Sequence, residues 1–83
     1  MGDYWHYQII NTGTESEPSL GIHEVYRSVT TKEVNSWTET PIDLGGFENI
    51  EYLKENVENI LEAIKNYPVL LESELEKNIK EKL

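Results

Sequence analysis

Histidine and carboxylate side chains that could act as acids, bases or metal ligands gather in the first half of this 83-residue chain. His23 and Glu24 are adjacent within residues 20–29, and three more polar side chains come within reach in some strand registers: His6, Tyr26 and Glu39. Neighbouring residues of a strand point to opposite faces, so His23 and Glu24 cannot serve one site together. A metal centre needs three or four converging ligands, which two histidines without a recognised spacing do not provide. We therefore expect structural or surface roles for these side chains, no cofactor and no enzyme activity. A small-molecule or catalytic site that uses His23, Glu24 or Glu39 is the alternative.

Three segments rich in β-branched and aromatic residues must position these side chains. Residues 4–10, 20–29 and 34–42 each have the composition of a strand, and Pro41 ends the last of them because it cannot donate to a ladder. Consecutive strands usually pair as antiparallel neighbours. The sequence therefore predicts a three-stranded antiparallel meander over residues 4–42, with residues 20–29 in the middle and the other two strands as edges. Apolar and polar residues mix on both faces of the middle strand, which indicates that both faces of the sheet are partly covered.

A helical period replaces the strand pattern after residue 48. Apolar residues recur at steps of three and four and form one stripe: Ile50, Leu53, Val57, Ile60, Leu61 and Ile64. Asn49 is a suitable N-cap and Pro68 stops the helix, which predicts a main helix over residues 49–67 that packs on the sheet. A weaker repeat predicts a C-terminal helix over residues 70–82. The expected fold is a single α+β domain over residues 1–83, with a βββα core and an additional C-terminal helix.

Composition limits the possible partners. Sixteen acidic residues against seven basic ones give a formal net charge of −9, so the chain repels phosphate backbones and we expect no direct binding to nucleic acid. No segment approaches the roughly 20 apolar residues of a membrane span, and the start lacks a basic segment followed by an apolar run. The chain also has no cysteine. We expect a cytoplasmic protein that does not bind membranes.

The aromatic residues exceed what one helix can cover on a three-stranded sheet. They include Tyr4, Trp5, Tyr7, Tyr26 and Trp37. Some of them must be covered by the C-terminal helix, by a second copy or by another protein, because a large exposed apolar patch marks an interaction surface. We therefore predict a non-catalytic protein-interaction module, preferably a homodimer, that acts through its sheet face, a strand edge or its C-terminal helix. The interaction candidates are His23, Tyr26, Arg27 and Trp37.

Four short motifs carry a resemblance to a set of small bacterial proteins of unknown function. In order they are Trp5-x-Tyr7, Ile22-His23-Glu24-Val25-Tyr26, Trp37-Thr38-Glu39-x-Pro41 and Pro68-Val69-Leu70. The resemblance covers residues 4–71 and implies no catalytic or binding residues. The layout of three strands followed by a helix, with an acidic balance, is more distantly similar to HicB-like antitoxin domains. That likeness implies an alternative role as an inhibitor of a basic RNase.

Overall fold

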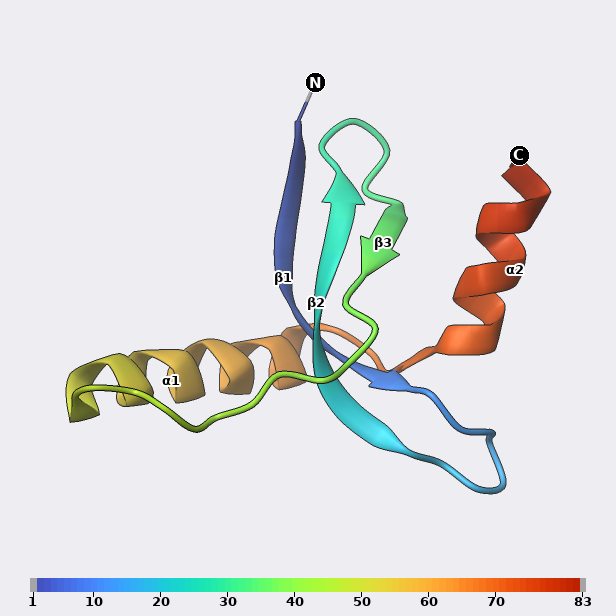
Figure 1. The fold of residues 1–83 in the computed structure, drawn as a ribbon. Helices are drawn as coiled ribbons and strands as arrows, with labels where there is room; N and C mark the ends of the chain where they lie inside the picture. Colours follow the sequence, from blue (N-terminus) through green and yellow to red (C-terminus); the bar gives the residue numbers. More distant parts are fainter. Residues whose placement is uncertain (1, 83) are drawn as a thin grey trace.

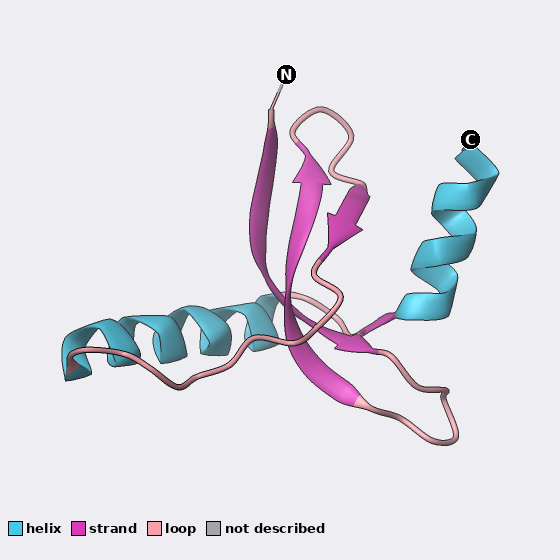
Figure 2. Ribbon diagram, in the orientation of Figure 1, coloured by secondary structure: helices cyan, strands magenta, loops and turns pink. Residues whose placement is uncertain are grey.

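The chain folds into one curled sheet with a helix on either side (Figures 1 and 2). The computed structural model describes residues 2–82. Along the chain the elements are β1 (Asp3–Asn11), β2 (Leu20–Ser28), β3 (Val34–Trp37), α1 (Ile50–Asn66), β4 (Leu70–Leu71) and α2 (Glu72–Lys82). The strand order is β3-β2-β1-β4. The α+β class and the antiparallel β1-β2-β3 meander are confirmed.

The predicted three-stranded sheet is incomplete, because β4 adds a fourth strand. Leu70 and Leu71 pair in parallel with Ile10 and Asn11, so the end of β1 lies inside the sheet and α2 begins at residue 72 rather than 70. Pro68 provides the physical reason. It ends α1 and holds Tyr67 in the extended conformation, which directs the two leucines alongside β1.

The third strand is shorter than predicted. β3 ends at Trp37, although the chain stays beside β2 through two further backbone bonds, from the Thr38 N–H to the Glu24 oxygen (3.1 Å) and from the Ile42 N–H to the Ile22 oxygen (2.8 Å). A register shift already interrupts the β2-β3 ladder near Tyr26. The ladder therefore loses its regularity well before Pro41.

A small core lies on one face of the sheet. Ile10 and Val25 are fully buried, and Leu75 of α2 packs against them. Three partly buried residues complete this cluster: Val34, Trp37 and Leu70. The β1-β2 register explains the grouping, because cross-strand partners share a face: His6 lies opposite Val25, and Gln8 opposite His23. Thus α2 covers the face of the sheet that carries Ile10 and Val25.

The main helix packs on the sheet as predicted, but only part of its apolar stripe is buried. Only Ile60 and Ala63 of this helix are buried, while Ile50 and Val57 are 58% and 47% exposed. The helix lies across the sheet and its N-terminal half projects beyond it (Figure 1). The predicted caps are nevertheless confirmed, since the Asn49 side chain accepts a bond from the Tyr52 N–H and the helix ends before Pro68. Among the described residues, no helix is long and apolar enough to cross a membrane.

Candidate functional site

Arg27 is the centre of a polar network that joins β1, β2 and the β2-β3 turn. Its Nε donates to His6 Nε2 (2.9 Å), its Nη2 to Gln8 Oε1 (3.1 Å) and its Nη1 to the Lys32 carbonyl (2.7 Å). Gln8 is 1% exposed and donates in turn to the Pro68 carbonyl (2.7 Å). The planar guanidinium of Arg27 therefore orients Gln8. The bond from Gln8 to Pro68 holds the C-terminal end of α1 against the sheet.

His6 has no nitrogen left for catalysis in this network. Its Nδ1 lies 2.9 Å from the Tyr7 carbonyl, which can only accept, so Nδ1 carries the proton. Its Nε2 accepts from Arg27, which can only donate. The ring is thus the neutral Nδ1–H tautomer, and it stacks on Tyr67 with centroids 3.8 Å apart. Both ring nitrogens are satisfied, which argues against a role as a base or a metal ligand.

His23 lies inside the protein rather than on its surface. It is 1% exposed, and its Nδ1 lies 2.8 Å from the Thr38 carbonyl, to which it must donate. This bond holds the segment after β3 against β2. As an interaction candidate His23 offers almost no surface in the single chain, whereas Tyr26, Arg27 and Trp37 are half-buried.

Glu24 and Tyr26 lie on the opposite face from His23. The Tyr26 hydroxyl donates to Glu24 Oε1 (3.0 Å), and this bond, together with burial and the carboxylate charge, raises the pKa of Tyr26. Burial and then the charge of Glu24 also raise the pKa of Tyr7, whose hydroxyl donates to Asn56 Oδ1 (3.0 Å). Both phenols are therefore kept protonated, which is the opposite of what a tyrosine nucleophile or base needs.

The structure does not bring the predicted chemical residues together. His23 is in the core, Glu24 is on the other face, and Glu39 follows β3 at the surface. Within the part of the chain that the structure describes, no three His, Cys, Asp or Glu side chains are arranged to hold a metal ion.

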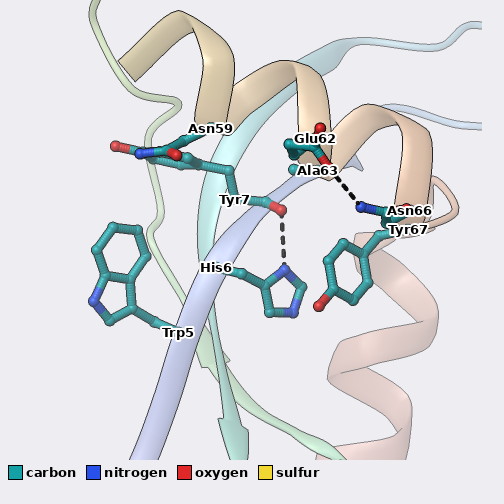
Figure 3. A pocket seen from close by; sticks show the side chains of 8 residues that line it. All are labelled: Trp5, His6, Tyr7, Asn59, Glu62, Ala63, Asn66 and Tyr67. Atoms are coloured by element: carbon teal, nitrogen blue, oxygen red, sulfur yellow. Dashed lines mark hydrogen bonds between the residues drawn. The ribbon is translucent and has the colours of Figure 1, made fainter. Parts of the chain in front are cut away.

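A first hollow lies between β1 and the C-terminal half of α1 (Figure 3). It has a volume of about 340 Å³ and is lined by Trp5, His6, Tyr7, Asn59, Glu62, Ala63, Asn66 and Tyr67. In Figure 3, Trp5 and Tyr67 stand on opposite sides of His6, and Asn66 donates to Glu62 (3.2 Å). The sequence does not predict this hollow, although Asn59, Glu62 and Asn66 recur at steps of three and four and therefore share one helix face.

A second hollow, the β3–α2 groove, lies between the edge strand and the C-terminal helix. It has a volume of about 310 Å³ and is lined by Asn35, Ser36, Trp37, Glu39, Glu72, Glu76 and Ile79. Trp37 Nε1 donates to Glu72 Oε2 (2.8 Å), which joins the two walls. None of these lining residues is basic. The groove thus combines an indole and an apolar side chain with three carboxylates.

Comparisons with protein families, with characterised proteins and with solved structures give no match to this chain.

Proposed function

We propose that this chain is a non-catalytic protein-interaction module that binds a basic segment of another protein in the β3–α2 groove. The observation that carries the proposal is the composition of the groove, which Glu39, Glu72 and Glu76 line together with Trp37. Carboxylates attract lysine and arginine side chains, and an indole adds a cation–π contribution of about 0.5–2 kcal/mol. The net charge of −9 attracts the same partner over a longer range.

This site combines three features predicted from the sequence. Trp37 is one of the interaction candidates, β3 is an edge strand, and α2 is the C-terminal helix. A basic RNase, the partner implied by the HicB-like layout, has the required charge. Electrostatic complementarity of this kind mainly accelerates association and sets specificity, so we expect binding to weaken as salt rises.

The test is an NMR titration of the labelled protein with a short peptide in which lysine or arginine alternates with apolar residues. We expect shift changes confined to residues 35–39 and 72–79. Glu76→Lys should abolish them, because this exposed residue lines the groove. Glu55→Lys is the matched control, with the same charge change on the exposed surface of α1. Equal loss of binding in both variants would show that only net charge matters and would refute the groove.

A small-molecule site is the second candidate, and the hollow in Figure 3 favours it. Its volume of about 340 Å³ falls at the lower end of ligand pockets, and it combines aromatic rings with two amides and a carboxylate. A thermal-shift screen of small polar compounds tests this function. A hit should be lost in Asn59→Leu and retained in Glu76→Lys, which changes the other hollow.

A further inference from the structure

The chain exposes more surface than a folded protein of its size. Its accessible surface is 6127 Å², whereas a monomer of 9.6 kDa has about 5,100 Å² by the usual scaling. Its radius of gyration is 13.9 Å, against about 12 Å for a compact chain of this length. The excess of about 1,000 Å² is comparable to the roughly 800 Å² that each partner buries in a standard interface. The fold therefore has enough surplus surface for one partner of ordinary size.

Much of the apolar part of that surface lies on α1. We use the name α1 stripe for five residues of this helix: Ile50, Leu53, Val57, Leu61 and Ile64. Leu53 is half-buried, and the other four are between 46% and 58% exposed. At 1.5 Å per residue the stripe is about 21 Å long. The buried residues of the helix, Ile60 and Ala63, lie on the neighbouring flank, which faces the sheet. The sheet does not bury the α1 stripe.

The spacing of the α1 stripe is symmetric about Val57. Its members lie seven and four residues before Val57, and four and seven residues after it. Two antiparallel copies related by a twofold axis at Val57 therefore match apolar residues at every level. Ile50 meets the partner's Ile64, Leu53 meets the partner's Leu61, and Val57 meets its own counterpart. Such a self-complementary patch is what a twofold interface requires.

The charges beside the stripe fit the same arrangement. At 100° per residue, Glu51, Lys54, Glu58 and Lys65 lie on the flank away from the sheet. In an antiparallel pair, the two flanks that carry these charges face each other. Lys54 then lies near the level of the partner's Glu58, and Lys65 near that of the partner's Glu51, which gives pairs of opposite sign. Glu58 also lies near the level of the partner's Glu58, so these exposed charges contribute little to the net stability of the pair.

We propose that a second copy of this chain covers the α1 stripe and forms an antiparallel helix pair with its twofold axis at Val57. The interface lies on the other side of the sheet from α2, so each protomer keeps its β3–α2 groove open (Figure 1). The dimer does not depend on the proposed binding of a basic partner, and either proposal can fail alone.

Cysteine cross-linking tests the orientation, because the natural chain has no cysteine. With a short bis-maleimide, Val57→Cys should link to itself, and a mixture of Ile50→Cys and Ile64→Cys should link to each other. Each of the last two variants alone should remain uncross-linked. Efficient self-linking of Ile50→Cys would indicate parallel helices and overturn the proposal.

Light scattering tests the dimer itself. We expect twice the mass of 9.6 kDa for the natural chain and for Glu55→Lys, which changes the polar side of α1. Leu61→Lys should weaken the dimer at least about 30-fold, because it places a charge within the apolar interface twice, opposite Leu53 of each copy. Leu61 is half-exposed in the single chain, so circular dichroism should show an intact fold. A monomeric natural chain at the highest soluble concentration, or an unchanged Leu61→Lys dimer, would overturn the proposal.

Discussion

Replacing Arg27 by alanine should lower the stability of the fold more than any charge removal at the surface. The change removes three hydrogen bonds, to His6, Gln8 and Lys32. The bond to Gln8 matters most, because Gln8 is 1% exposed and its Oε1 would lose its donor in the interior. A buried acceptor left without a partner costs about 1–3 kcal/mol.

The expected total loss of unfolding free energy is about 2–4 kcal/mol. This total includes the charge-assisted bond to His6 as well as the bond to Gln8, and it counts the exposed bond to Lys32 as small. A domain of this length has an unfolding free energy of about 4–12 kcal/mol, so the change is a large fraction of it. The midpoint of thermal unfolding should fall by about 8–32 °C. Arg27→Lys should lose most of the same stability, because an ammonium keeps the charge but cannot replace the planar fork.

Urea unfolding followed by circular dichroism measures this loss, with the protomer concentration held constant in case the chain is a dimer. Lys77→Ala is the matched control, since it removes one exposed positive charge from α2 and should change stability by less than about 0.5 kcal/mol. The network would have no structural importance if Arg27→Ala unfolded at the same urea concentration as Lys77→Ala. Full retention of stability in Arg27→Lys would show that charge, rather than fork geometry, is what Arg27 provides.

Three further changes test other parts of the fold. Gly13→Ala should destabilise the chain by about 1–3 kcal/mol in urea unfolding, because its Cβ would overlap the backbone oxygen of Glu17, whereas Gly2→Ala meets nothing within 4 Å and should be neutral. Asn49→Ala should cost about 1 kcal/mol by the same assay, through the lost N-cap of α1; an unchanged midpoint would contradict the cap. The raised pKa of Tyr26 contributes stability that is complete below the unfolded value of 10.0 and disappears as pH rises through the higher folded value. Tyr26→Phe should therefore reduce the alkaline loss of stability, and an identical pH profile would argue against the bond to Glu24.

Local signals in the sequence correctly predicted most of the secondary structure. Asn49 and Pro68 delimit α1 as expected, because a capping side chain and a missing N–H act within a few residues. The β1-β2-β3 meander also follows from local composition. By contrast, β4 depends on pairing between residues 60 positions apart, and two leucines carry no local signal for that partner.

The candidate sites were less predictable than the fold. The sequence indicates Trp37 as an interaction candidate and Glu39 as a residue of the alternative catalytic or ligand site. Glu72 and Glu76 join them only because α2 packs beside β3. His23 was also recognised, yet its burial and its bond to Thr38 depend on how the segment after β3 folds back. Residue type alone does not show which polar side chains the fold encloses.

The sequence by itself determined the α+β class, the ends of α1, the symmetric spacing of its apolar residues and the acidic balance, because each depends on residues close together or on composition. Only the tertiary structure decided which flank of α1 the sheet covers. Two contacts fix the helix on β1: the Tyr7 hydroxyl donates to Asn56 near the middle of the helix, and Tyr67 at its C-terminal end stacks on His6. The apolar face of α1 is wider than the flank that these contacts cover, so the stripe about Val57 remains exposed.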